Sequence, residues 1–192
     1  MSRTKEFDPD TVLDRAMDIF WRKGYTATSI QNLVDEMGIQ RGSLYATFGS
    51  KHELFLAALD RYRARSYQRL QGVFAEAASP RAAIEQALTA IVTDSMEKKK
   101  LYGCLLTNST VELAPHDPDT AARIEEHRLA VEALFRAAIE QGQQSGEFHS
   151  NETPEALTNF IFIVIQGLRV MSKTAATRDD LDDAARITMS VL

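Results

Sequence analysis

Residues 26–55 read TATSIQNLVDEMGIQRGSLYATFGSKHELF. Apolar residues recur here at helical spacing in two short runs, which predict one helix over 28–37 and another over 41–48. Gly38 lies between the two runs, at the point where a tight turn needs a left-handed residue. Two short helices joined by such a turn are typical of a helix-turn-helix.

Capping residues mark the starts of the helices in this region. Thr28 followed by Gln31 predicts a capping box at the first helix, and Ser50 followed by Glu53 predicts another at the helix that comes next. Helices this short are not stable alone, so both must pack on a partner. A helix over 9–23, with a proline at its first position, supplies that partner.

The second short helix keeps a polar face after its apolar side chains are buried. Arg41 is long enough to reach guanine O6 and N7 in a major groove, while Tyr45 and Thr47 can donate to phosphates. Lys51 follows at the start of the next helix, where the helix dipole and the ammonium group both favour a phosphate. The face expected to be exposed consists of Gln40, Arg41, Gly42, Ser43, Tyr45, Ala46 and Thr47.

The rest of the chain also follows helical periodicity, with no strand pattern of useful length. Further helices are predicted over 50–77, 80–97, 101–114, 118–144, 154–173 and 178–192. We therefore expect an all-α fold in two parts. A helix-turn-helix domain of residues 1–50 is joined, through the long helix, to a larger helical domain of residues 51–192.

Composition places the chain among ordinary globular proteins. Of its 192 residues, 44% are hydrophobic and 26% charged, and the net charge is −5. Its one cysteine excludes an intrachain disulfide and suggests a reducing compartment. The first residues contain no apolar stretch, and the longest such run, 160–165, is too short to cross a membrane. We expect a cytoplasmic protein with no membrane partner.

Residues 26–55, together with AMDIFWRKGY at 16–25, resemble the N-terminal domain of the TetR/AcrR family of bacterial transcriptional regulators. The resemblance covers residues 9–56. It implies that helix 41–48 is the recognition helix and that the protein binds double-stranded operator DNA, usually as a dimeric repressor at a palindromic site. It implies phosphate contacts by Thr28, Ser29, Tyr45, Thr47 and Lys51, and base contacts by Arg41, Gly42, Ser43 and Ala46.

The segment 154–173 is apolar on all sides, which predicts that one side faces the core and another a second subunit. With 178–192 it suggests a four-helix interface between two copies, which the resemblance also implies. A single thick monomer core is the alternative. The expected interface residues are Phe160, Ile161, Val164, Ile165, Leu168, Leu181, Ala184 and Ile187.

A candidate effector pocket lies near the middle of the chain. Cys104, Asn108 and Glu112 share one helical stripe, and they either line a pocket or cap and crosslink the bundle. Arg169, on a very apolar helix, needs a carboxylate or a ligand anion unless it extends into solvent. The candidate pocket for an unidentified small-molecule effector contains Tyr102, Cys104, Leu105, Asn108, Glu112, Phe135, Phe162, Gln166 and Arg169.

Cys104 has two further interpretations. The segment 98–113, KKKLYGCLLTNSTVEL, resembles a helix of some family members that sense electrophiles or oxidants through a cysteine placed like this one. A helix N-terminus and the upstream lysines 98–100 would lower the thiol pKa, whereas apolar burial would raise it and make the thiol inert. Sensing and simple packing both remain open.

Other features point away from metal and catalytic sites. The four histidines lack the spacing of metal ligands, and no phosphate loop, nucleophile elbow or paired carboxylate is present, so we expect no cofactor and no enzyme. Arg61, Arg65 and Arg69 form a stripe that either is solvated or pairs with the acidic second part. We predict a ligand-responsive, homodimeric repressor whose long helix transmits the effector signal. A helical interaction module that does not bind DNA is the remote alternative.

Overall fold

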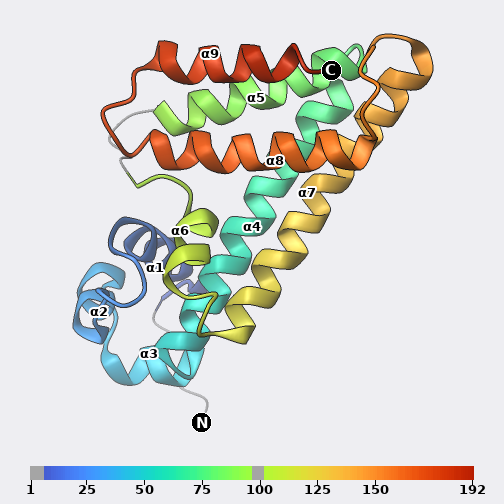
Figure 1. Cartoon of the computed structure of the whole chain (residues 1–192). Helices are drawn as coiled ribbons and strands as arrows, with labels where there is room; N and C mark the ends of the chain where they lie inside the picture. Colours follow the sequence, from blue (N-terminus) through green and yellow to red (C-terminus); the bar gives the residue numbers. More distant parts are fainter. Residues whose placement is uncertain (1–6, 97–101) are drawn as a thin grey trace.

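The computed structural model describes residues 7–96 and 102–192. Within these residues the chain forms nine α-helices and no strand, which confirms the all-α prediction (Figure 1). The helices are α1 (Pro9–Lys23), α2 (Ile30–Met37), α3 (Arg41–Phe48), α4 (Lys51–Glu76), α5 (Pro80–Met96), α6 (Leu105–Glu112), α7 (Pro118–Ser145), α8 (Pro154–Met171) and α9 (Arg178–Met189). No helix of the described ranges is long and apolar enough to cross a membrane.

Local chemistry explains where the first helices begin and end. The Asp8 carboxylate accepts hydrogen bonds from the N–H groups of Asp10 and Thr11, and so caps the start of α1. Gly24 ends α1 and Gly38 ends α2, with φ of +79° and +68°. Residues with a Cβ rarely adopt such angles, so glycine is required at both turns.

The capping box of α2 lies one residue after the predicted position. The Ser29 hydroxyl accepts a hydrogen bond from the Asn32 N–H (3.0 Å), and the Asn32 side-chain oxygen accepts one from the Ser29 N–H (3.2 Å). The expected box of Thr28 and Gln31 is therefore wrong. The Thr28 hydroxyl instead donates to the carbonyl oxygen of Gly24 (2.6 Å).

Helices α1 to α3 share a core with the first half of α4. Leu33 of α2 and Leu44 of α3 are fully buried there, as expected for helices too short to be stable without a partner. Phe20 of α1 packs edge-to-face on Phe55 of α4, with ring centroids 5.2 Å apart. These contacts hold the two short helices in place.

Helix α4 belongs to two hydrophobic cores. Its first half, which begins at the cap where the Ser50 hydroxyl accepts from the Glu53 N–H (3.0 Å), is buried against α1. Its second half places Leu70 and Phe74 against the core formed by α5, α7 and α8. The two halves of the molecule are therefore joined by one continuous helix, as Figure 1 shows.

The arginine stripe of α4 forms ion pairs on both sides of this junction. Arg61 and Arg65 pair with Asp14 of α1 (2.5 and 2.8 Å), and Arg69 pairs with Asp94 of α5. Arg69 thus pairs with the acidic second part as predicted, whereas Arg61 and Arg65 differ from the prediction by pairing with the helix-turn-helix part.

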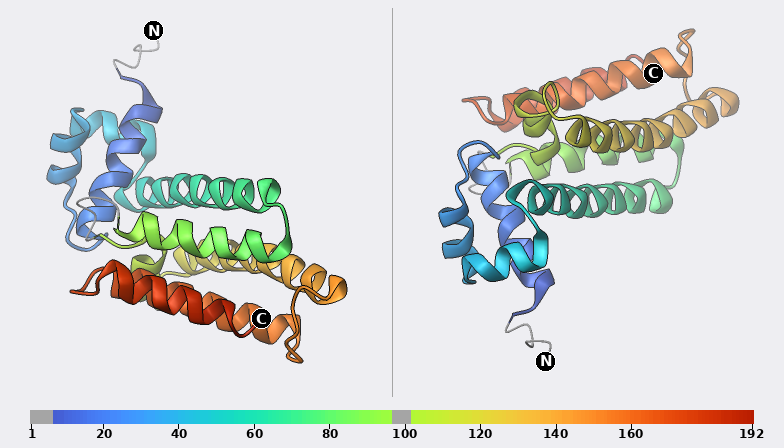
Figure 2. Two further views of the ribbon diagram at one scale, coloured as in Figure 1. Left: turned by 90° about the horizontal axis from the view of Figure 1, so that it is seen from above. Right: turned by 90° about the horizontal axis from the view of Figure 1, so that it is seen from below.

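The second half of the molecule is a bundle. Helices α4, α5, α7, α8 and α9 lie side by side, with α1 to α3 at one end of the bundle (Figure 2). Helix α6 is shorter than predicted, because Gly103 adopts a φ of +64° and Cys104 is the N-cap. The upstream lysines 98–100 lie outside the described residues.

Candidate nucleic-acid interface and effector cavity

Helix α3 presents a polar face to solvent. Leu44 is completely buried and anchors the helix, while Tyr45 is 43% exposed. An added Cβ at Gly42 would meet no atom within 4 Å, so this position is open. Of the predicted contact residues, Gln40, Arg41, Gly42, Tyr45 and Ala46 are exposed, and Ser43 and Thr47 are half-buried.

The predicted phosphate-binding residues on either side of α3 differ in how exposed they are. Ser29 is exposed at the start of α2. Lys51 is half-buried, and its Nζ lies 4.1 Å from the centroid of the Tyr25 ring, a cation–π contact that fixes the ammonium group. Partial burial lowers the pKa of Lys51, and nearby Glu112 opposes that effect.

Thr28 does not belong to this exposed set. Its side chain is completely buried, and its hydroxyl is used by the Gly24 carbonyl oxygen. The expectation that Thr28 donates to a phosphate is corrected on this ground.

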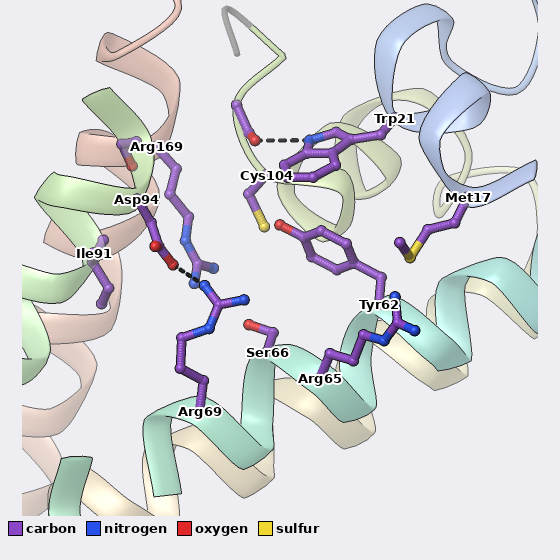
Figure 3. A pocket seen from close by; sticks show the side chains of 12 residues that line it. Met17, Trp21, Tyr62, Arg65, Ser66, Arg69, Ile91, Asp94, Cys104 and Arg169 are labelled. Atoms are coloured by element: carbon purple, nitrogen blue, oxygen red, sulfur yellow. Dashed lines mark hydrogen bonds and ion pairs between the residues drawn. The ribbon is translucent and has the colours of Figure 1, made fainter. Parts of the chain in front are cut away.

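A cavity of about 270 Å³ lies where the two halves of the molecule meet (Figure 3). Met17 and Trp21 of α1 form one wall, and Tyr62 of α4 lies beside them. Cys104, just before α6, and Arg169 of α8 form other parts of the lining. The Trp21 indole N–H donates to the carbonyl oxygen of Gly103 (2.8 Å), which ties α1 to the same segment.

A smaller cavity adjoins the first and is lined by helices α4, α5, α7 and α8 of the bundle. Its lining is largely apolar, with Leu70 of α4, Val131 of α7 and Phe162 of α8. His127 of α7 and Arg169 are the polar groups of interest, and Arg169 lines both cavities.

The predicted pocket residues do not gather in one site. Cys104 and Arg169 line the larger cavity, and Phe162 lines the smaller one. Leu105 and Phe135 are buried in the hydrophobic cores. Their inclusion in the pocket is corrected because neighbouring apolar side chains already cover them.

The remaining pocket candidates crosslink helices. Gln166 accepts a hydrogen bond from the Thr107 hydroxyl (2.8 Å). The Asn108 amide donates to the Tyr102 carbonyl oxygen (2.6 Å), and its oxygen accepts from Lys173 (3.1 Å). Tyr102, Asn108 and Glu112 line a separate, open groove between α1, α6 and α8. These contacts favour crosslinking for Asn108, but Cys104 of the same stripe lines the larger cavity, so the pocket interpretation of the stripe stays a proposal.

Glu112 has the most specific of these contacts. Its carboxylate accepts hydrogen bonds from the backbone N–H groups of Tyr25 (3.1 Å) and Thr26 (2.7 Å), in the turn between α1 and α2. Glu112 therefore connects α6 directly to the helix-turn-helix.

The thiol of Cys104 is buried beside a positive charge. Burial alone would raise the pKa of Cys104, yet the positive charge of Arg169 and hydrogen bonds with Thr107 and Tyr62 together bring it below its ordinary value. Burial raises the pKa of Tyr62 well above its usual range, so its hydroxyl stays protonated and can donate to the sulfur. Figure 3 shows the Tyr62 hydroxyl directed at Cys104.

The expected dimer residues divide into buried and exposed groups. Four of them, Ile161, Ile165, Leu168 and Leu181, are 0–3% exposed and belong to the core of their own chain. Their assignment to an interface is corrected, because each is already covered by neighbouring helices. Val164 and Ala184 are half-buried.

An apolar surface nevertheless remains on α8 and α9. Phe160 is 42% exposed and Ile187 is 55% exposed, and both were predicted. Ile163, at 69%, is more exposed than either and was not predicted. The exposed apolar surface, as we define it, consists of Phe160, Ile163, Val170, Met171, Ile187 and Val191.

Comparison with known proteins agrees with this architecture. The family of bacterial regulatory proteins described as the tetR family matches residues 12–58, and the tetracyclin repressor-like C-terminal domain matches residues 81–188. The chain belongs to the TetR family. The two matches cover the helix-turn-helix and most of the helical bundle.

Several TetR-family relatives match over nearly the whole chain. The transcriptional regulator YezE of Bacillus subtilis is 32% identical over 100% of both chains. The transcriptional repressor ComR of Escherichia coli is 32% identical over 97% of this chain and 90% of its own. A cysteine-substituted form of the TetR-family regulator CifR, solved with 26-base-pair operator DNA, is 30% identical, has a TM-score of 0.87 and covers 98% of both chains.

Apart from Cys104, Phe162 and Arg169, the residues that line the two cavities were not predicted as pocket residues, and five of them have aromatic or basic side chains. They are Trp21, Tyr62, Arg65, Arg69 and His127. The spacing of Arg65 and Arg69 predicted that they share a stripe of their helix with Arg61, but the sequence does not show what that stripe faces. His127 lies in a charged run and gave no signal of burial.

Proposed function

We propose that this chain is a homodimeric transcriptional repressor that binds a palindromic operator through α3. The observation that carries the proposal is the exposed polar face of α3, with Ser29 before it and Lys51 after it. The repressor ComR and the operator-bound CifR support it as relatives. DNA contacts are assigned to Ser29, Gln40, Arg41, Gly42, Ser43, Tyr45, Ala46, Thr47 and Lys51.

Dimerisation is part of this proposal. One recognition helix buries too little surface to select a site, so two copies must act together on two half-sites. We assign that contact to the exposed apolar surface of α8 and α9, which in a twofold dimer would meet the same surface of the second copy. The protein would act in the cytoplasm, where bacterial DNA is found, and it has no catalytic role.

The effector is proposed to bind in the cavity between the halves. We keep the division into residues 1–50 and 51–192, but the cavity receives Met17 and Trp21 from the first part. A ligand there would press on α1 and change the distance between the two recognition helices. A coupling of about 1–3 kcal/mol would change operator affinity about 5- to 150-fold.

The test measures binding of the purified protein to DNA from upstream of its own gene. Fluorescence anisotropy reports the affinity at several salt concentrations. A repressor gives sequence-selective binding whose affinity falls steeply with salt. Equal affinity for a scrambled sequence would show that α3 does not read bases. Absence of any salt-sensitive binding would favour a helical interaction module instead.

A second candidate function is regulation through Cys104. The favouring observation is the thiol in the cavity wall, beside Arg169 and Tyr62, with its pKa below the ordinary value. The thiolate sulfur would add to the electron-poor carbon of an electrophile such as N-ethylmaleimide, and a proton from water would complete the adduct at the neighbouring carbon. Release of operator by N-ethylmaleimide from the wild type, but not from Cys104→Ser, is expected. Equal release from both would assign Cys104 a structural role.

A further inference from the structure

The two cavities form one composite site with two kinds of wall. They share Ser66, Arg69, Ile91, Asp94 and Arg169 in their linings, so they adjoin along this edge. The smaller cavity extends the site into apolar surroundings, while the charged groups Arg69, Asp94 and Arg169 line the edge that the two cavities share. A ligand that fills both must therefore combine an apolar body with a polar end.

The charges of the composite site do not balance. Arg65 pairs with Asp14, and Arg69 pairs with Asp94. Asp94 is the only carboxylate among the described residues that line either cavity. Arg169 forms no ion pair with any residue that the structure describes, although it lines both cavities. One guanidinium group is left to attract an anion, and Figure 3 shows Arg169 reaching into the space between Asp94 and Cys104.

His127 is a second polar side chain of the composite site, besides Arg169, that has no partner among the described residues. Its side chain is only 6% exposed, it lines the smaller cavity, and neither ring nitrogen has a hydrogen-bond partner in the described part of the chain. Leaving such a group unpaired is costly. Burial first, and then the positive charges of Arg169 and Arg63, lower the pKa of His127 to about 4. The neutral ring therefore keeps one N–H donor at pH 7.

From these observations, and on the basis of the proposed function, we infer that the effector is a small organic carboxylate with an apolar body. Its carboxylate binds Arg169 and accepts a hydrogen bond from the ring N–H of His127. Its apolar part lies between Val73, Val131 and Phe162 in the smaller cavity. The larger cavity measures about 270 Å³ and the smaller one about 50 Å³, which limits the ligand, and above all its apolar part, to a modest size.

The test uses matched acids and amides on the full-length protein, without DNA. Benzoate, phenylacetate and isovalerate are titrated by calorimetry, each beside its primary amide, which has nearly the same shape but no charge. At least one acid is expected to bind saturably, and its amide at least about tenfold more weakly, because a hydrogen bond to a charged group is the stronger kind. Equal binding of acid and amide, or no binding of any acid at millimolar concentration, overturns the inference.

Variants then locate the binding site. Arg169→Gln is expected to weaken binding of the acid about ten- to hundredfold, and Arg169→Lys, which keeps the charge, should lose less. His127→Phe should weaken it severalfold. Arg186→Gln is the matched control, because Arg186 is an exposed arginine of α9 that pairs only locally, with Asp183. Unchanged affinity in both Arg169 variants, each shown by circular dichroism to be folded, contradicts the assignment.

Release of DNA is measured in a separate experiment, so that failure of the proposed repressor function can be distinguished from failure of the proposed ligand class. If the wild type binds no upstream DNA, the proposed repressor function fails, while the calorimetry still decides the ligand class. If an acid binds but leaves operator affinity unchanged, its role as effector is overturned. Binding together with at least about fivefold weaker operator affinity supports both.

Discussion

The Glu112 carboxylate lies 2.7 Å from the backbone nitrogen of Thr26, across the boundary between the helical bundle and the helix-turn-helix. Glu112 is the last residue of α6, and Cys104, in the cavity wall, is the N-cap of the same helix. One eight-residue helix therefore spans the distance from the effector cavity to the turn that precedes α2. A movement of α6 at the cavity would therefore also move Glu112 and the turn that it binds.

Replacing Glu112 should weaken this connection. Glu112→Ala removes the acceptor of two backbone N–H groups, and we expect a loss of about 1–2 kcal/mol in the free energy of unfolding, since both groups are partly solvated. Urea denaturation measures the change. Glu112→Gln keeps one oxygen acceptor and should lose less. Identical stability of all three proteins would show that the contact contributes nothing.

The DNA-reading residues should separate by salt dependence. Arg41→Ala is expected to cost about 1–3 kcal/mol on the cognate operator and to relax base preference at one position of each half-site. Lys51→Ala should weaken binding to all DNA alike and reduce the salt slope by about one. Anisotropy with cognate and scrambled DNA tests both. Equal effects of Arg41→Ala on the two sequences would contradict a base contact.

Substitutions at Gly42 test whether α3 lies close to the DNA, because this position can be changed without disturbing the fold. Because an added Cβ meets no atom within 4 Å, Gly42→Ala should stabilise the free protein by about 0.5–1 kcal/mol. Gly42→Phe should remain folded but lose operator binding, because the ring occupies the space needed by the DNA. Thermal melting measures the stability and anisotropy measures the DNA binding. Operator binding by Gly42→Phe at wild-type affinity would show that α3 does not lie close to the DNA at this position.

Two neighbouring isoleucines of α8 distinguish the core from the proposed interface. Ile163→Glu, at a 69% exposed position, should give folded monomers, whereas Ile165→Glu, at a 1% exposed position, should destabilise the chain by several kcal/mol, about 3 or more. Light scattering and circular dichroism measure the two outcomes. A wild type that is monomeric at micromolar concentration would remove the interface on α8 and α9.

The low pKa of His127 predicts a loss of stability in acid. The folded value of about 4 lies below the unfolded value of 6.5, so the contribution is complete above pH 6.5 and is lost as the pH falls to about 4. The difference corresponds to roughly 3 kcal/mol. His127→Phe should flatten the pH dependence of urea unfolding over this range, and the exposed-site control His116→Phe should not. Parallel curves for His127→Phe and the wild type would rule out the titration.

Local signals in the sequence predicted the helix-turn-helix well. Asp8, Gly24 and Gly38 act on their own helix ends, so their effects depend on a few neighbouring residues. The one error there, Thr28, arose because two adjacent hydroxyl residues can both cap a helix. Which of them does so depends on the Gly24 carbonyl, which only the folded turn places nearby.

The site was less predictable, because its residues meet through tertiary packing. The spacing of Cys104, Asn108 and Glu112 predicted a common stripe, yet each side chain binds a different element around α6. On α8, apolar residues on every side gave no indication of which side faces the core. Ile163 and Ile165 are chemically identical, and only the packing of neighbouring helices separates them.

The position of Met17 and Trp21 in the cavity wall has a consequence for how such regulators can be recombined. A hybrid protein joined at residue 50 would take α1 from one parent and the remaining walls of the cavity from another. The hybrid would keep the DNA preference of the first parent. Its cavity, however, would have α1 side chains that do not match the other walls, so its response to the ligand would change. A working exchange of specificity requires the α1 side chains to be transplanted along with the bundle that they contact.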